Sequence, residues 1–162
     1  MTPANNATLK IWDPATGNTT TGFNTFIYGE GNRSAAIDPI RGRILLSNDV
    51  LNNSWKWHAL SNGASTNVDP GAALHFLQGS ALEWDTIGNR YIYYSEGQTA
   101  YAIDPVTFVG TSLNFTGTPA PNATPNAIFS KMRFVPELGG LVFLTNATNN
   151  VYFVKLYNSR YT

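Results

Sequence analysis

Histidine and cysteine are the side chains that most often bind metals or act as nucleophiles and bases, and this sequence offers few of them. It has no cysteine and two histidines, His58 and His75. Without cysteine there is no disulfide framework, thiolate nucleophile or cysteine-ligated metal. His58 follows Trp57 in a strand-like run without a His-X-His or His-Glu pair, so we expect a strand residue rather than a metal ligand. His75 lies in a loop, where it is a candidate contact to a ligand.

Aspartate and arginine recur together at a fixed separation. Asp38 precedes Arg43, and Asp85 precedes Arg90, with a glycine-containing turn between the two residues in each case. Two carboxylates at one repeat position could suggest acid–base catalysis. Their place between an apolar run and a turn instead predicts that each aspartate shapes its turn and that each arginine braces the aspartate of its own hairpin. No Gly-X-Ser-X-Gly motif, which marks the nucleophile of many hydrolases, occurs in the sequence.

The elements that position these side chains are predicted to be β-strands. The stretch 80–110 contains three short runs of aromatic and β-branched residues separated by turn-forming residues. Such residues fit the half-buried surface of a sheet, and the runs are too short for helices. Turns at 86–89 and 95–98 therefore predict a three-stranded antiparallel meander, which ends at Asp104-Pro105. The segment 111–116 can add a fourth strand.

The rest of the chain repeats this unit. Asp13-Pro14-Ala-Thr16 matches Asp104-Pro105-Val-Thr107, two periods of about 45 residues away. The segment 36–47 aligns in sequence with 83–94. The segment 133–144 aligns with both, and it has Val135 and Gly140 in place of the aspartate and arginine. Four-stranded units at this period are the sequence signature of a β-propeller.

The predicted fold class is therefore all-β, with propeller blades of four antiparallel strands and no helix. With the strands of one blade called a to d, the chain reads c-d, a-b-c-d, a-b-c-d, a-b-c. The predicted domain 1–162 is a partial propeller, and its parts are a half blade at 8–27, blades at 34–69 and 80–117, and a closing blade without its outer strand at 130–157.

Several of these runs carry a family resemblance. The segment 134–144, followed by 150–156, looks like the closing blade of kelch-like propeller domains of the galactose-oxidase central-domain type, and it has their Gly139-Gly140 pair. The Asp-Pro-X-Thr ends are similar to quinoprotein-type blades. The resemblance implies a propeller fold. It carries over no radical copper activity, because that site needs a cysteine cross-linked to a tyrosine, so we expect no cofactor, metal or catalytic residue.

An array of this length leaves a propeller open. Propellers close with about four to eight blades, and open ends expose strand edges and an apolar blade face. Two partners could cover them. One is the remainder of a longer propeller chain, and the other is a second copy in a homo-oligomer, with the c-d half blade of one copy joined to the a-b-c blade of the other in a C2 pair.

Composition excludes several function classes. Charged residues make up 12% of the chain and the formal net charge is zero. A nucleic-acid partner needs a basic face, and a membrane span needs an apolar run of roughly 20 residues, and the sequence has neither. Low charge with many Asn, Thr and Gly residues is typical of an extracellular or surface-exposed protein, secreted or virion-associated. Residues 1–6 lack the features of a signal peptide, so we expect a secreted form to be mature.

Asn-X-Ser/Thr triplets mark possible glycosylation sites, although a chain rich in these residues also yields such triplets by chance. They begin at Asn6, Asn18, Asn32, Asn52, Asn114, Asn122 and Asn146.

In a propeller, the b-to-c and d-to-a loops emerge on one face, where ligands usually bind. The predicted ligand-binding residues on that face are Glu30, Arg33, Asn48, Asp49, His75, Gln78, Glu96 and Asn149. This polar set suits a glycan or protein ligand and lacks the positioned acid–base pairs of hydrolases. The sequence thus favours a non-enzymatic binding or structural module. The alternative is the C-terminal portion of a secreted oxidoreductase, lyase or glycosidase whose catalytic residues lie partly outside this chain.

Overall fold

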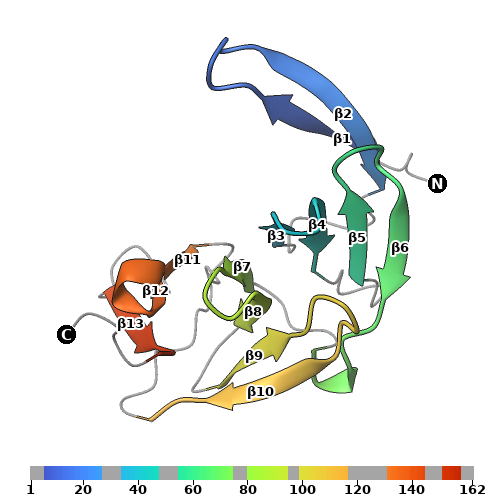
Figure 1. Cartoon of the computed structure of the whole chain (residues 1–162). Helices are drawn as coiled ribbons and strands as arrows, with labels where there is room; N and C mark the ends of the chain where they lie inside the picture. Colours follow the sequence, from blue (N-terminus) through green and yellow to red (C-terminus); the bar gives the residue numbers. More distant parts are fainter. Residues whose placement is uncertain are drawn as a thin grey trace.

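The chain folds into four antiparallel β-sheets (Figure 1). A computed structural model describes residues 6–26, 34–47, 55–74, 80–94, 99–116, 131–144 and 151–157. These residues form thirteen strands and no α-helix, so the predicted all-β class is confirmed. The described part of the chain also contains no helix that is long and apolar enough to cross a membrane.

Each sheet is a meander, because strands that pair in space also follow one another along the chain. The first sheet contains β1 (Asn6–Trp12) and β2 (Thr19–Phe26). The second contains β3 (Ala35–Asp38), β4 (Arg43–Leu46), β5 (Trp55–Ala59) and β6 (Ser65–Val68). The third contains β7 (Ala81–Asp85), β8 (Arg90–Tyr94), β9 (Thr99–Ile103) and β10 (Gly110–Asn114). The fourth contains β11 (Met132–Val135), β12 (Gly140–Leu144) and β13 (Val151–Lys155).

Two single-turn 3-10 helices also occur in the described residues, which contain no α-helix, as predicted. They are η1 (Ala72–Leu74), before the third sheet, and η2 (Pro136–Leu138), between β11 and β12. In η2, proline supplies the fixed φ of a helical first turn, and Gly139 ends the turn with a φ of 62° in the left-handed region. The β11–β12 hairpin of the fourth sheet therefore turns through a helical turn, where the first hairpins of the second and third sheets use aspartate-stabilised turns.

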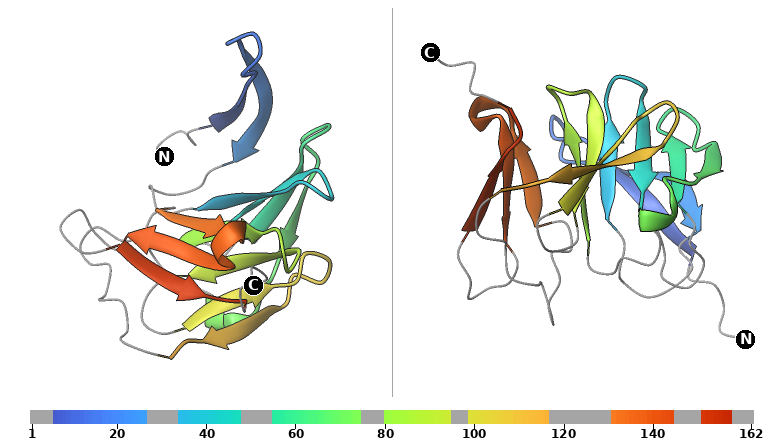
Figure 2. Two further views of the ribbon diagram at one scale, coloured as in Figure 1. Left: turned by 60° about the vertical axis from the view of Figure 1, so that its left-hand side comes forward. Right: turned by 90° about the horizontal axis from the view of Figure 1, so that it is seen from below.

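The sheets are arranged as an arc with their first strands on the inside. Strand β3 lies against β7, and β7 lies against β11. Figure 1 shows the later strands of each sheet running outward from this line, with the hairpin β1–β2 at one end of the arc and the fourth sheet at the other. Figure 2 shows the same sheets side by side and the hairpin standing apart from the fourth sheet.

The hydrophobic core consists of two layers, one on each face of the third sheet. Tyr91 and Tyr93 of β8 belong to the layer shared with the second sheet, whereas Ile92 and Tyr94 belong to the layer shared with the fourth. All four side chains are at most 2% exposed. The alternation follows from the two-residue period of a strand, and an all-apolar strand is the expected result of covering both faces.

Large aromatic residues bridge the sheets within these layers. Trp55 of the second sheet meets Tyr93 of the third edge-on, with ring centroids 4.9 Å apart. Tyr94 of the third sheet meets Phe143 of the fourth at 4.8 Å. Edge-on and tilted rings are favourable because the positive edge of one ring faces the negative face of the other. These four aromatic residues, each at most 3% exposed, are therefore core residues.

Candidate interaction surfaces

The eight side chains predicted to contact a ligand lie outside the described residues, so their grouping stays a prediction. They are Glu30, Arg33, Asn48, Asp49, His75, Gln78, Glu96 and Asn149. Of the possible glycosylation sites, Asn18 and Asn114 are described and exposed, and only the backbone of Asn6 is described, in β1. The sites at 32, 52, 122 and 146 fall outside the described part of the chain.

The two repeated aspartates shape their turns, as predicted. Asp85 is fully buried, and its Oδ1 accepts hydrogen bonds from the backbone N–H groups of Ile87 and Gly88 at 3.0 and 2.9 Å. Its Oδ2 accepts from Nε of Arg90 at 3.0 Å. This carboxylate therefore closes its own hairpin and is not available as a catalytic acid or base.

Asp38 is used in the same way in the second sheet. Its Oδ1 accepts from the backbone N–H groups of Ile40 and Arg41, both at 3.0 Å. Its Oδ2 lies 3.0 Å from Nη1 of Arg41 and 3.6 Å from Nε of Arg43. The predicted bracing of each aspartate by the arginine five residues later is confirmed, and in this hairpin Arg41 adds a second cation.

The aspartates of the Asp-Pro-X-Thr motifs form the turns after β1 and β9. Oδ1 of Asp104 accepts from the backbone N–H groups of Val106 and Thr107 at 2.8 and 2.7 Å, and these bonds lower the pKa of the Asp104 carboxyl. The side-chain hydroxyl of Thr16, 2.8 Å from Oδ2, is the main cause of the lowered pKa of Asp13. Both exposed carboxylates are thus held ionised by local turn geometry.

The two repeated arginines also connect neighbouring sheets, which the sequence does not predict. Nη2 of Arg43 donates to the backbone carbonyl of Pro105 in the third sheet. The Arg43 guanidinium also lies 4.9 Å from the ring centroid of Phe108 in that turn. Such a cation–π contact is favourable because the ring face is electronegative. Arg43 therefore joins the first turn of one sheet to the last turn of the next.

Arg90 repeats this connection between the third and fourth sheets. Its Nη2 lies 3.1 Å from the hydroxyl of Tyr157, which follows β13, and its guanidinium lies 5.7 Å from the Tyr157 ring centroid. The Tyr157 hydroxyl donates to Oδ2 of Asp85. Burial, followed by the neighbouring Asp85, raises the pKa of Tyr157 to about 12, so the phenol stays protonated as a donor. We call the Asp38–Arg43–Pro105 and Asp85–Arg90–Tyr157 groups the two clamps.

His58 is a strand residue, as predicted. It lies in β5, pairs with Ile44 of β4 and is 2% exposed. Burial lowers its pKa, because the charged imidazolium is poorly solvated there. Among the described residues, no group of three or more His, Cys, Asp or Glu side chains could hold a metal ion.

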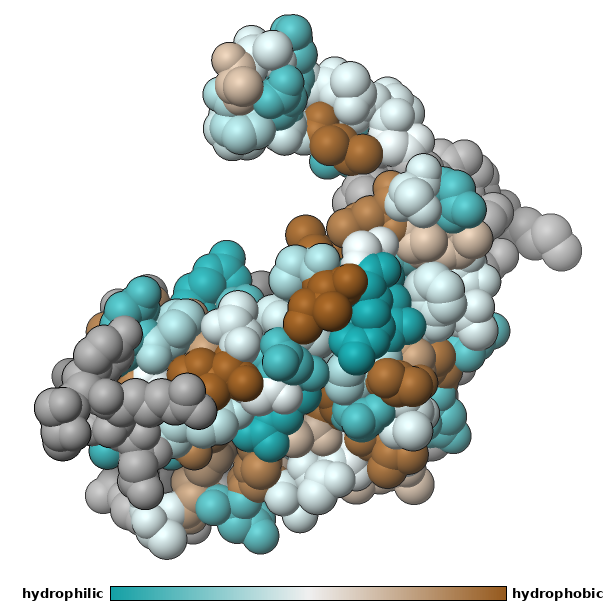
Figure 3. Space-filling view, viewed as in Figure 1, coloured by the Kyte–Doolittle hydropathy of each residue, from teal (hydrophilic) through white to brown (hydrophobic). Residues whose placement is uncertain are grey.

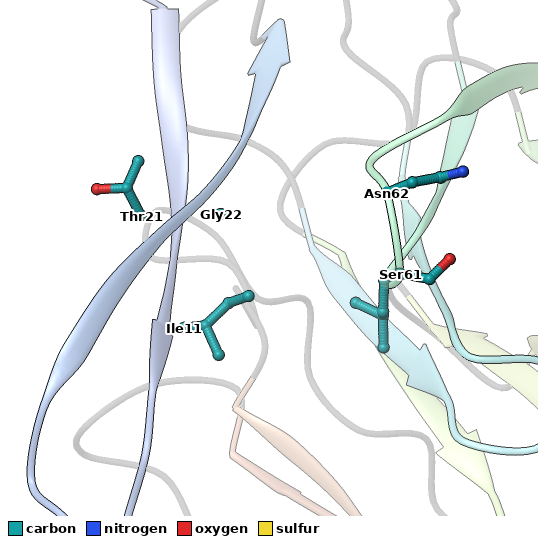
Figure 4. A pocket seen from close by; sticks show the side chains of 6 residues that line it. Ile11, Thr21, Gly22, Ser61 and Asn62 are labelled. Carbon is teal, nitrogen blue, oxygen red and sulfur yellow. The ribbon is translucent and has the colours of Figure 1, made fainter.

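A cavity of about 240 Å³ lies between the hairpin β1–β2 and the turn after β5. It is lined by Ile11, Thr21, Gly22, Leu60, Ser61 and Asn62. Figure 4 shows Ile11 directed toward that turn, whereas the polar ends of Thr21, Ser61 and Asn62 point away from the gap. A sugar needs hydrogen-bonding groups directed into its pocket, so this gap between two elements does not suit one.

Apolar side chains are also exposed on two other parts of the surface. Ile40, Val106 and Leu138 are exposed apolar residues of turns. Figure 3 shows separate hydrophobic patches surrounded by hydrophilic ones on the side of the molecule that it draws. The outward face of the fourth sheet carries Leu144, Val151 and Phe153, which are 37%, 62% and 47% exposed. Single exposed apolar residues are ordinary, whereas several on one sheet face indicate a surface that another element covers.

No protein-family model matches this chain, and the comparison with curated proteins finds no match. The hydrogen bonds and pKa directions of the carboxylates are therefore the basis for a functional proposal. The buried carboxylates of Asp38 and Asp85 are occupied by turn N–H groups and arginines, and those of Asp13 and Asp104 have lowered pKa values. These carboxylates thus support structure.

Proposed function

We propose that this chain is a run of consecutive β-propeller blades, of the kelch-like type, and that it works as a non-enzymatic module that recognises a glycan or protein. The repeated contact between sheets carries this proposal. Propeller blades are four-stranded sheets set around a central axis. Neighbouring first strands, in the order β3, β7 and β11, are the contact expected near such an axis.

The clamps support the same arrangement. Arg43 and Arg90 occupy equivalent positions at the start of β4 and β8, and each reaches the turn that follows the third strand of the next sheet. A repeated contact between successive units, with each unit touching only its neighbours, is typical of repeat proteins. The four sheets are therefore interpreted as units of one array and not as separate sandwiches.

A binding role agrees better with the carboxylates than an enzymatic one. A general acid at neutral pH needs a carboxyl group whose pKa is raised by burial or by a neighbouring negative charge. Hydrogen bonds within turns shift the pKa values of Asp13 and Asp104 in the opposite direction. The charges of Asp38 and Asp85 are paired with arginines of their own hairpins.

The topology favours one end of the sheets as the ligand face. In every meander, the turns after the first and third strands leave from one end, and the connections after the second and fourth leave from the other. Figure 2 shows the described turns together on one side. Among the predicted ligand residues, Asn48, Asp49 and Glu96 fall in sequence between the second and third strands of their sheets, so the proposal assigns them to the opposite end.

A glycan array and a protein pull-down with the purified chain test this function. We expect a glycan or protein to bind, and we expect the double variant Asn48→Ala with Asp49→Ala to weaken binding at least about tenfold. A matched control is the double variant Thr16→Ala with Asn18→Ala, on a turn of the opposite end. Two empty screens together with turnover of a candidate substrate would contradict the proposal and favour the enzyme-fragment alternative.

A further inference from the structure

One face of each four-stranded sheet is covered by the next sheet, and equivalent strand positions form the contact in both cases. In the second sheet, Leu45 pairs with Trp57, and both belong to the core layer shared with the third sheet. In the third sheet, Ile92 pairs with Ala102, and both belong to the layer shared with the fourth. Leu45 and Ile92 each lie two residues after the clamp arginine and are fully buried.

The fourth sheet has a face equivalent to the covered faces of the second and third sheets. Val142 lies two residues after Gly140, which replaces the clamp arginine, and it pairs with Phe153. The neighbouring pair, Leu144 with Val151, corresponds to Tyr94 with Ala100 in the third sheet. Tyr94 and Ala100 are 2% and 0% exposed, whereas Leu144 and Val151 are 37% and 62% exposed. This set of four residues, Val142, Leu144, Val151 and Phe153, is called the end face.

The other end of the array has the matching feature. Trp12 precedes Asp13 as Ile103 precedes Asp104, so these two residues occupy equivalent positions in their third strands. Ile103 is fully buried against the sheet before its own, whereas Trp12 is 63% exposed. Ile11 lines the cavity beside the second sheet, so alternation along β1 directs Trp12 to the opposite side.

The charges beside these residues are complementary. Lys155 follows the end face at the turn end of β13, and Asp13 follows Trp12 at the equivalent position of β1. Both side chains are exposed, and turn hydrogen bonds keep the Asp13 carboxylate ionised. An exposed pair of opposite charges adds little affinity, but it favours the correct orientation of two surfaces.

We propose that the end face binds the β1–β2 hairpin of a second copy of this chain, with Val151 and Phe153 packed on Trp12. The inference rests on the proposed propeller array, since it continues the contact series between successive sheets. Figure 1 shows the two surfaces at opposite ends of the arc, so one chain does not bring its own pair together. A head-to-tail contact made twice closes a symmetric pair.

Light scattering after gel filtration, over a hundredfold range of concentration, tests the proposal. We expect the unmodified chain to form a dimer. The variants Phe153→Asp and Trp12→Asp should each raise the dimer dissociation constant at least about tenfold, because each places a charge in both contacts. The control Val106→Asp, at a 66% exposed apolar residue of the β9–β10 turn, should leave the dimer unchanged. Circular dichroism and thermal unfolding check that every variant folds.

Mixing the two variants makes the test specific for a head-to-tail contact. A mixed pair has one contact with both Phe153 and Trp12 intact, so the mixture should recover dimer that neither variant forms alone. A monomeric unmodified chain would overturn the proposal, as would a Trp12→Asp variant that dimerises normally. The ligand screens report independently on the proposed function, because a monomer that binds glycan overturns only the docking, and a dimer without a ligand overturns only the recognition.

Discussion

Replacement of Asp85 by alanine tests whether the clamps hold the array together. The carboxylate is fully buried and serves four donors, namely the backbone N–H groups of Ile87 and Gly88, Nε of Arg90 and the hydroxyl of Tyr157. Breaking a buried ion pair by removing one partner costs about 3–5 kcal/mol. Because the Arg90 side chain is 28% exposed and water can solvate it, we expect a loss near 3 kcal/mol, the lower end of that range.

Two further variants separate the parts of this loss. Asp85→Asn keeps an oxygen for the turn N–H groups, but it replaces the oxygen that accepts from Arg90 and Tyr157 with an NH2 donor and removes the charge, so it should cost at least about 1.5 kcal/mol. Asp104→Ala removes an exposed carboxylate that accepts the same turn hydrogen bonds and that only the charge of Arg41 affects from a distance, and it should cost at most about 1 kcal/mol. The contrast between Asp85 and Asp104 therefore measures the whole Asp85–Arg90–Tyr157 clamp, in which the Tyr157 hydroxyl makes the contact between the third and fourth sheets.

Urea unfolding followed by tryptophan fluorescence supplies the free energies. Trp55 and Trp84 are buried in the layer between the second and third sheets, so their emission should shift to longer wavelength on unfolding. The reasoning is refuted if Asp85→Ala costs no more than Asp104→Ala, since the clamp would then contribute nothing beyond its local turn.

Two other perturbations follow from buried contacts. Burial lowers the pKa of His58 in the folded protein, so on acidification the unfolded chain binds a proton at this residue before the folded chain does. The free energy of unfolding should therefore fall as the pH drops below the unfolded pKa of about 6.5. The variant His58→Gln should reduce this pH dependence. Urea midpoints at pH 7.5 and 5.5 measure it, and equal pH dependence in both proteins would contradict the assignment. Gly140→Ala should destabilise the fourth sheet, because a Cβ there would meet the backbone carbonyl of Val154 and lie 2.8 Å from ring carbons of Phe153. Gly42→Ala, where a Cβ meets nothing within 4 Å, is the control for Gly140→Ala in thermal unfolding, and a larger loss at Gly42 would show that its φ of 60° outweighs the clash.

Local features of this protein could be predicted because their causes lie within a few residues. An aspartate before a glycine-containing turn binds backbone N–H groups two and three residues ahead, which accounts for Asp38 and Asp85. Successive side chains of a strand point to opposite faces, so an uninterrupted run of large apolar residues such as 91–94 places apolar side chains on both faces of its sheet. The turn η2 was beyond such reasoning, because Val135 and Gly140 remove the aspartate and arginine and leave only a proline–glycine signal.

The clamps contain contacts between sheets that the sequence does not predict. The sequence predicts that Arg43 and Arg90 pair with the aspartates of their own hairpins, since those partners are five residues away. Their second partners, Pro105 and Tyr157, lie 62 and 67 residues further along the chain. Nothing in the spacing identifies such partners, because they meet only when successive sheets stack.

The sequence by itself determined the strands, their turns and the repeat, since strand formation depends on residue type and on hydrogen bonds across a short turn. Tertiary structure alone decided which faces are covered. The end face and the face of the third sheet that the fourth sheet covers have the same apolar pattern, yet Tyr94 is 2% exposed and its equivalent Leu144 is 37% exposed. The physical reason is that burial depends on whether a neighbouring sheet is present, and a strand's own residues carry no information about that neighbour.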